Sequence, residues 1–225
     1  MDYRLEQWIN GPAGSHPAID AVMIAAARWG EALFISVVVL WFVAGWLLGR
    51  SRDRQGAITA LVAAGLALLA NQAIIHLWAR PRPFVAHPDS VHRLLAHTSD
   101  PSFPSDHASP AFAIGFVLVW FHRRAGAAVL SLATLMCVAR VYVGDHYPGD
   151  VGAGAVVGLV VAVLLLTVLN PVMEIVERVT GRILSALHLP ARTARREYPA
   201  RVSIEQPSDE PATVPGPVPA GRTEQ

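Results

Sequence analysis

Apolar residues along this chain come in long blocks instead of alternating with polar ones, and six of these blocks predict helices. A helix of about 17 to 25 apolar residues crosses a bilayer, and the second, third and sixth blocks are long enough to do so. The first block is short and holds Asp20 and Arg28, so it predicts a tilted crossing, an interfacial helix or a re-entrant one. The blocks cover residues 17–29, 32–49, 57–78, 105–122, 125–143 and 148–176.

The pattern changes after residue 176. Residues 177–194 form an amphipathic segment with several arginines, and residues 195–225 are rich in Pro, Glu, Ser and Arg. Chains of this second composition bury too little apolar surface to fold. We therefore predict a membrane-embedded domain of residues 1–176, a cytoplasmic basic segment of residues 177–194 and a disordered cytoplasmic tail of residues 195–225.

The composition predicts an all-α polytopic membrane protein, because 53% of the 225 residues are hydrophobic and only 16% are charged. The single cysteine, Cys137, lies inside an apolar block, so this chain alone cannot build a disulfide framework or a cysteine-based metal site. The net charge of +1 favours no class of partner.

Three polar clusters lie at the ends of apolar blocks, where ionisable groups are costly and usually functional. They stand at the end of the third block, at the start of the fourth, and between the fifth and the sixth. If all six blocks cross the membrane, the three clusters emerge on the same face, which predicts one shared site. The clusters are Arg80-Pro81-Arg82-Pro83, Pro104-Ser105-Asp106-His107, and Arg140 with Asp145, His146 and Asp150.

Most other arginines fall on the opposite face of the predicted bundle. Arginine-rich loops stay in the cytoplasm, so this face is predicted to be cytoplasmic and the three clusters extracytoplasmic. With six crossings, both termini of this multi-pass plasma-membrane protein are then cytoplasmic. The arginines concerned are Arg50, Arg52, Arg54, Arg123, Arg124, Arg178, Arg182, Arg192, Arg195 and Arg196.

His146 and Asp150 are four residues apart across a Pro-Gly pair, so they straddle the start of the last predicted helix. Asp150 can hold one ring N–H of the imidazole, which leaves the other nitrogen as a nucleophile for covalent phosphoryl transfer. His107 lies in the second cluster, from which it can protonate the departing oxygen as a general acid.

The remaining groups suit an oxyanion. Ser105 follows a proline and opens a predicted helix, so it is a natural N-cap, and the free amides at such a helix start favour anions. Arginine forks match phosphate oxygens, and Arg140 ends the fifth helix near the same place. Together these residues predict a phosphate site.

Several of these residues also have a simpler interpretation. Arg140 can be an interfacial arginine with its head group in water, and Asp150 a helix cap. Glu31 is either interfacial or part of the lining of the site. The segment after the first cluster is either a solvated loop or a metal site, because imidazole and carboxylate bind metals. Its candidate ligands are His87, Asp89, His92, His97 and Asp100.

On these motifs the chain resembles the type 2 phosphatidic acid phosphatase superfamily, the membrane relatives of vanadium haloperoxidases. The family's second motif, Pro-Ser-Gly-His, appears here as Pro104-Ser105-Asp106-His107. Its third motif, which is Ser-Arg, five residues, His, three residues and Asp, appears as Ala139-Arg140, His146 and Asp150. The aspartate in place of glycine is similar to the bacterial subgroup that hydrolyses undecaprenyl pyrophosphate.

The family's first motif, which is a lysine, six residues and Arg-Pro, is only partly present. The lysine position is Ile75 if Arg82 is the motif's arginine, and Ala73 if Arg80 is. The candidates to replace the missing contact are Arg80, Asn71 and His76.

The resemblance implies a six-helix membrane bundle of the phosphatase and haloperoxidase kind, and a role for each site residue. His146 is implied to be the nucleophile that forms a phosphohistidine, Asp150 its orienting partner and His107 the acid. No metal and no cofactor are implied. The predicted phosphate-binding residues are Arg80, Arg82, Ser105, Asp106 and Arg140.

We therefore expect an integral membrane lipid phosphatase, an undecaprenyl-diphosphatase that serves carrier recycling for peptidoglycan and bacitracin resistance. Its expected partners are a polyprenyl pyrophosphate lipid and the bilayer, without nucleic acid. A phosphatase for phosphatidate or phosphatidylglycerophosphate is the alternative within the same class. In a different class, the missing lysine leaves open an inactive relative that acts as a membrane partner or transport protein.

Overall fold

The computed structural model describes residues 1–96 and 100–186, which form eight helices and contain no strand. The all-α fold class expected from the apolar blocks is therefore confirmed. The predicted disordered tail and the end of the basic segment lie outside the described residues. In chain order the helices are α1 (Asp2–Asn10), α2 (Pro17–Leu47), α3 (Ser51–Leu77), α4 (Pro83–Ala86), α5 (Ala108–Phe121), α6 (Arg123–Tyr142), α7 (Pro148–Thr167) and α8 (Asn170–Ala186).

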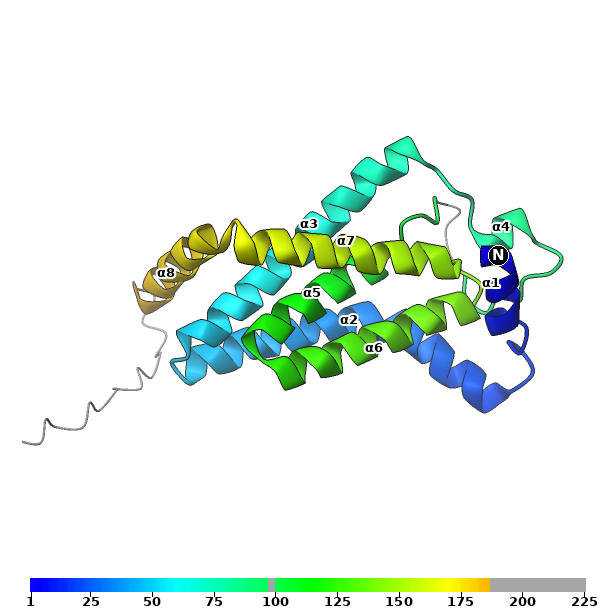
Figure 1. Cartoon of the computed structure of the whole chain (residues 1–225). Helices are drawn as coiled ribbons and strands as arrows, with labels where there is room; N and C mark the ends of the chain where they lie inside the picture. The colour runs from blue at the N-terminus through cyan, green and yellow to red at the C-terminus, as the bar shows by residue number, and fades with distance from the viewer. Residues whose placement is uncertain (97–99, 187–225) are drawn as a thin grey trace, which may run out of the picture. The chain divides into compact units, whose positions relative to one another are not determined.

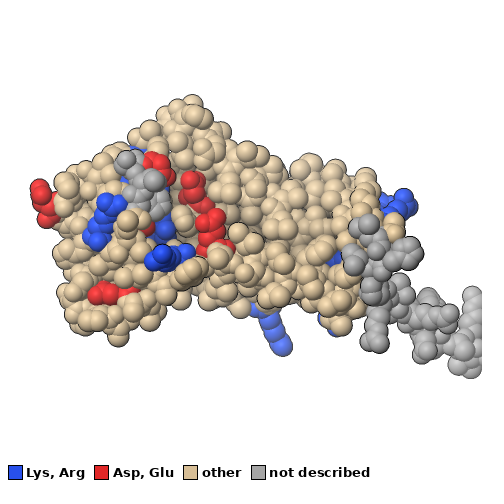
Figure 2. Space-filling view, turned by 180° about the vertical axis from the view of Figure 1, so that it is seen from behind, with Lys and Arg blue, Asp and Glu red and all other residues tan. Residues whose placement is uncertain are grey.

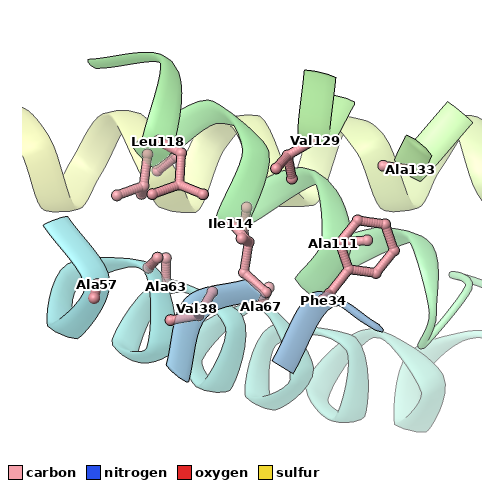
Figure 3. Packing of buried hydrophobic residues seen from close by; sticks show 14 of the residues in the cluster. Phe34, Val38, Ala57, Ala63, Ala67, Ala111, Ile114, Leu118, Val129 and Ala133 are labelled. Atoms are coloured by element: carbon pink, nitrogen blue, oxygen red, sulfur yellow. The ribbon is translucent and has the colours of Figure 1, made fainter. Parts of the chain in front are cut away.

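Helix α5 is the centre of the bundle, and α3, α6 and α7 pack around it (Figure 1). Most of its apolar side chains, among them Ile114 and Leu118, are buried, whereas Trp120 near its end is exposed. The buried ones share one core with Ala63 of α3 and Val129 of α6 (Figure 3). A helix that is apolar all round belongs in the interior of a bundle, so the composition of α5 accounts for its place.

Four helices, α2, α3, α6 and α7, are long and apolar enough to cross a membrane. With 20 residues each, α6 and α7 are about 30 Å long, which matches the hydrocarbon thickness of a bilayer. Helix α5 has only 14 residues and is about 21 Å long. The loop that precedes it is therefore drawn into the depth of the bundle, where Ser102 and Ser105 are fully buried.

Small residues let the helices approach closely. In α3, Ala60, Ala63 and Ala67 are spaced by three or four residues and are fully buried. In α7, a Cβ added to Gly158 would lie 2.6 Å from the carbonyl oxygen of Ser109 in α5, so only glycine allows this contact. Close backbone packing of this kind is what holds helices together in lipid.

The outer surface of the helices is largely uncharged. Figure 2 shows charged side chains towards the two ends and a broad band without charge between them. Large apolar side chains of the long helices are exposed, such as Leu40 of α2 and Val160 of α7. So extensive an exposed apolar surface suits lipid rather than water.

The predicted count of six helices is wrong, because the first two apolar blocks form the single helix α2. This helix runs without a break through Gly30 and Glu31, where we expected a boundary. A Cβ added to Gly30 would lie 2.6 Å from Sδ of Met136, so the glycine serves close packing of α2 on α6. The bundle therefore has five long apolar helices, of which α5 is the shortest.

This correction moves the N-terminus. Helix α1, which the pattern did not predict, lies at the end of the bundle where α6 ends and α7 begins (Figure 1). Asp2 of α1 bonds Arg80 of the first polar cluster at 2.7 Å. The N-terminus therefore shares a face with the predicted site, and the combination of a cytoplasmic N-terminus with an extracytoplasmic site is wrong.

The last predicted block is also two helices. Helix α7 ends at Thr167, and α8 begins at Asn170. Helix α8 continues through residue 176 and is tied to α3 by an ion pair of 2.6 Å between Arg54 and Glu177. The boundary expected at residue 176 thus falls inside a helix, and the division into three parts stays a prediction.

Candidate active site

The three polar clusters meet at the end of the bundle that carries α1. Nη1 of Arg82 lies 3.2 Å from Nε2 of His146 and donates to the carbonyl oxygen of Asp145 at 3.2 Å. The backbone N–H of Ser105 donates to the carbonyl oxygen of Asp150 at 3.1 Å, which joins the second cluster to the third. Arg82, Ser105, His146 and Asp150 are all at most 2% exposed. The convergence that we expected from the apolar blocks is therefore present.

The ring of His146 is oriented by Ser102, a residue outside the predicted clusters. Nδ1 of His146 lies 3.0 Å from the carbonyl oxygen of Ser102 and 3.3 Å from its hydroxyl. The same hydroxyl donates a short hydrogen bond to Oδ2 of Asp150. Oδ2 of Asp150 is itself 3.8 Å from Nδ1, too far for a hydrogen bond. The direct bond expected between Asp150 and His146 is thus replaced by a link through Ser102.

This arrangement fixes which nitrogen can react. The carbonyl oxygen of Ser102 can only accept, so the proton of the neutral ring belongs on Nδ1 of His146. The lone pair then lies on Nε2, where it accepts the N–H of Arg82 at 3.2 Å. Nε2 is therefore the ring nitrogen that can act as a nucleophile, once this N–H of Arg82 turns to another acceptor.

Asp150 is both a helix cap and a member of the site. As the third residue of α7, it accepts the backbone N–H of Tyr147 at 2.8 Å, which closes a capping box. Its other oxygen accepts from Nη1 of Arg80 at 2.8 Å. The two interpretations of Asp150 are therefore compatible, because the cap holds the carboxylate where Ser102 needs it.

Helix α5 begins at Ala108, three residues later than predicted. Ser105 nevertheless caps it, because its hydroxyl accepts the N–H of Ala108 at 3.3 Å and its carbonyl accepts that of Ser109 at 3.1 Å. The start of α5, with the partial positive charge of a helix N-terminus, therefore lies in the site.

His107 faces the same space from the start of α5. Its ring centroid is 6.3 Å from that of His146, and its Nε2 lies 3.9 Å from Oε2 of Glu31 in α2. Glu31 thus lies at the edge of the site, with its side chain 61% exposed, so both interpretations of Glu31 stay open.

Arg140 is buried and paired within the third cluster. Its Nη2 lies 3.3 Å from Oδ2 of Asp145, and both side chains are at most 4% exposed. The turn that brings Asp145 back onto α6 passes through Gly144, whose φ of +84° favours glycine. A Cβ there would also lie 2.8 Å from Cγ1 of Val91. Arg140 is therefore a buried site residue and not an interfacial arginine with its head group in water.

Arg80 and Asp106, like Arg82, Ser105 and Arg140, bond protein groups. Nη1 of Arg80 donates to the carboxylates of Asp2 and Asp150, at 2.7 and 2.8 Å. Oδ1 of Asp106 accepts from Nδ2 of Asn71 at 2.9 Å. A phosphate contact by Arg80 or Asp106 stays a prediction.

The residues proposed to replace the missing lysine differ in burial and position. Asn71 is fully buried one helical turn before Ile75, where it also accepts the hydroxyl of Ser109 at 2.9 Å. His76 is exposed on the last turn of α3. Asn71 thus reaches the second cluster from the face of α3 on which the lysine is expected if Arg82 is the motif's arginine.

The loop after the first cluster packs on α1. The ring of His87 stacks on Tyr3 with centroids 3.8 Å apart, and the backbone of His92 bonds Asn10. In residues 1–96 and 100–186, no three His, Cys, Asp or Glu side chains come together as metal ligands. His97 lies outside the described residues.

The family model of the PAP2 superfamily matches residues 56–174, which hold all three clusters in the order of the family's motifs. The chain belongs to the PAP2 superfamily. The resemblance seen in the motifs is thereby confirmed, and with it the class of protein, a multi-pass membrane phosphatase.

Three curated relatives are similar to this chain, and two of them are named as undecaprenyl-diphosphatases. The chain is 30% identical to undecaprenyl-diphosphatase BcrC of Bacillus subtilis (strain 168), over 83% of this chain and 95% of that protein. It is 33% identical to the bacitracin transport permease protein BcrC of Bacillus licheniformis, over 65% of this chain and 74% of that protein. It is also 33% identical to putative undecaprenyl-diphosphatase YbjG of Escherichia coli (strain K12), over 71% and 78%.

A solved structure has the same fold. LpxE of Aquifex aeolicus superposes with a TM-score of 0.58 at 24% identity, covering 73% of this chain and 94% of that one. At this identity the likeness concerns the fold alone, which is the membrane bundle described above.

Proposed function

We propose that this chain hydrolyses undecaprenyl pyrophosphate to undecaprenyl phosphate and inorganic phosphate. The relatives named as undecaprenyl-diphosphatases support the substrate. The observation that supports the chemistry is the placement of His146, with Nδ1 held by Ser102 and Nε2 beside Arg82.

The proposed reaction has two steps. Nε2 of His146 attacks the terminal phosphorus, and the bond from that phosphorus to the bridging oxygen breaks. Protonated His107 gives its proton to the departing undecaprenyl phosphate, which leaves a phosphohistidine. Neutral His107 then takes a proton from water as the water attacks the phosphorus, which releases inorganic phosphate and restores both histidines.

Charge on the transferred phosphoryl group requires donors that are already in place. We assign this role to Arg82, Arg140 and the capped start of α5 at Ser105. Each preorganised donor of this kind contributes on the order of 3 kcal/mol to transition-state stabilisation. Arg80 and Asp106 are proposed as secondary phosphate contacts.

The proposed site is extracytoplasmic in the plasma membrane. The turn between α5 and α6, with Arg123 and Arg124, lies at the opposite end of the bundle, as does Arg52 at the start of α3 (Figure 1). Such arginines favour a cytoplasmic location for that end. The N-terminus is then extracytoplasmic together with the site.

The test is phosphate release by the purified protein in detergent with EDTA, from undecaprenyl pyrophosphate and from phosphatidate. The wild type is expected to prefer the pyrophosphate, His146→Ala to lose activity at least 1000-fold, and the exposed control His16→Ala to retain it. Label from the terminal phosphate should appear on the wild-type protein and be absent from His146→Ala. Preference for phosphatidate would instead favour a phosphatase of that lipid class.

The relative named as a transport permease motivates a second candidate, an inactive membrane partner. The two functions differ in one measurement. An inactive partner releases no phosphate from either lipid, and its function survives His146→Ala.

A further inference from the structure

Helix α1 docks on the catalytic end through a polar face. Asp2, Glu6 and Asn10 are spaced by four residues and therefore lie on one side of the helix. Glu6 and Asn10 are at most 1% exposed, whereas Leu5 and Trp8 on the other side are 52% and 78% exposed. The helix thus turns its polar side inward and its apolar side outward, which is the reverse of a surface helix in a soluble protein.

Asn10 anchors the C-terminal end of this face by hydrogen bonds. Its side-chain amide donates to the carbonyl oxygens of His92 and Tyr142, at 2.8 and 2.7 Å, and accepts the N–H of His92 at 2.7 Å. These bonds join α1 to the loop before α5 and to the end of α6. Three bonds from one amide fix the register of α1 over the site.

At the N-terminal end of α1, Asp2 contacts the site itself. Its Oδ2 accepts from Nη1 of Arg80 at 2.7 Å, and its Oδ1 accepts the N–H of Gly149 at 2.8 Å. A Cβ added to Gly149 would lie 2.7 Å from Oδ2 of Asp2, so the approach requires glycine at that position. The same Nη1 of Arg80 donates to Asp150 at 2.8 Å.

We propose that Asp2 is a positioning residue of the reaction, which holds Arg80 on Asp150 and so fixes the Ser102 link that orients His146. This proposal rests on the proposed function for its kinetic test. With two carboxylates on Nη1, the guanidinium, which also lies 3.8 Å over the ring of Tyr147, has one defined position. Without Asp2, Arg80 is held in place on one side only.

The charge of Asp2 also bears on the histidine. Loss of a negative charge near the Arg80–Asp150 pair leaves a more positive environment, which disfavours protonation of His146. The other ionisable groups around this histidine come from several parts of the chain and are unchanged by a substitution at Asp2. Arg82, His107 and Asp150 lie against it. Asp100 pairs with Arg82, and Arg140 pairs with Asp145.

The experiment compares Asp2→Asn, Asp2→Glu and the exposed α1 control Arg4→Gln with the wild type, as pH profiles of kcat and kcat/KM on undecaprenyl pyrophosphate. Asp2→Asn is expected to lower kcat about tenfold, the size usual for loss of an outer partner that orients a reacting group. KM should change less than twofold, and the acid limb of the kcat/KM profile should move to lower pH. Asp2→Glu should restore the acid limb to its wild-type pH, and Arg4→Gln should match the wild type in all three quantities.

A second readout does not depend on activity. The ring signal of His146, assigned by its loss in His146→Ala, is titrated by NMR in detergent, and its midpoint is expected to fall in Asp2→Asn. Asp2→Asn could lower kcat without moving either the acid limb of the kcat/KM profile or the titration midpoint of His146. Asp2 would then serve only the fold, which overturns the proposal. If the wild type releases no phosphate, the proposed function fails, and the midpoint alone then decides whether Asp2 acts on His146.

Discussion

At the scale of single residues, the reactivity of the site depends on Ser102. Its carbonyl oxygen fixes the proton of His146 on Nδ1, and its hydroxyl links the carboxylate of Asp150 to the imidazole ring. Motif spacing predicted His146 and Asp150 but could not predict this intermediary, because Ser102 is 44 residues from His146 in the chain. Nothing in its sequence neighbourhood separates it from an ordinary loop serine. A buried hydroxyl next to a motif is the only available signal, and burial is a property of the fold.

Ser102→Ala is expected to lower kcat about 10- to 100-fold with little change in KM, because the ring loses an outer partner that orients it. The carbonyl oxygen remains, so the favoured tautomer is kept and the loss stays below that of His146→Ala. Phosphate release under saturating lipid measures the effect. Ser131→Ala, which removes a hydroxyl bonded only to the carbonyl of Ala127 on α6, is the matched control. Equal kcat for Ser102→Ala and the wild type would contradict the link.

At the scale of helices, the sequence predicted the elements that follow apolar blocks and missed those that depend on tertiary contacts. The starts and ends of α3, α5 and α6 and the start of α7 lie within six residues of the expected ones, whereas α7 ends nine residues early, at Thr167. The break expected near Gly30 is absent, because the side chain of Glu31 lies near that of His107 and Gly30 packs on Met136. Helix α1 has nine residues and a polar composition, so only its partners reveal that its polar face is buried.

Glu6 makes the stability of α1 depend on pH. Its carboxylate oxygens are buried without a hydrogen-bond partner among the described residues, and burial raises the pKa of Glu6 from 4.5 to about 7. Below pH 4.5 the folded and unfolded states both hold the proton. Between pH 4.5 and 7 the unfolded chain releases it first, so the folded state loses stability as pH rises, on the order of 2 kcal/mol in all.

Glu6→Gln removes this titration. Its apparent Tm in detergent should match that of the wild type near pH 4.5 and exceed it by several degrees at pH 8, as measured by thermal unfolding across that range. Glu174→Gln, which changes an exposed carboxylate on α8, should give the same difference at both pH values. A Tm difference for Glu6→Gln that does not grow with pH would show that Glu6 is not the group responsible.

At the scale of the whole molecule, the charged residues at the two ends of the bundle bear on its orientation in the membrane. Arginines lie in the turns at one end of the bundle, and the acid-rich face of α1 belongs to the other end. The apolar blocks correctly predicted that the site and these turns lie at opposite ends, because that depends only on α3 to α7. The N-terminus lies at the end of the site because the first two blocks form the single helix α2. Which end is cytoplasmic stays a prediction, and the position of the N-terminus tests both the fold and the orientation.

Cysteine labelling makes this test possible, since the one native cysteine, Cys137, is buried and can be changed to serine. Single cysteines at Arg4→Cys in α1 and Asp89→Cys in the loop before α5 are expected to react with a membrane-impermeant maleimide in intact cells. Arg124→Cys, in the turn between α5 and α6, should react only after the membrane is permeabilised. Labelling of Arg4→Cys and Asp89→Cys from opposite sides would contradict the docking of α1. Labelling of both only after permeabilisation would keep the fold and reverse the orientation, so that the phosphatase site would face the cytoplasm.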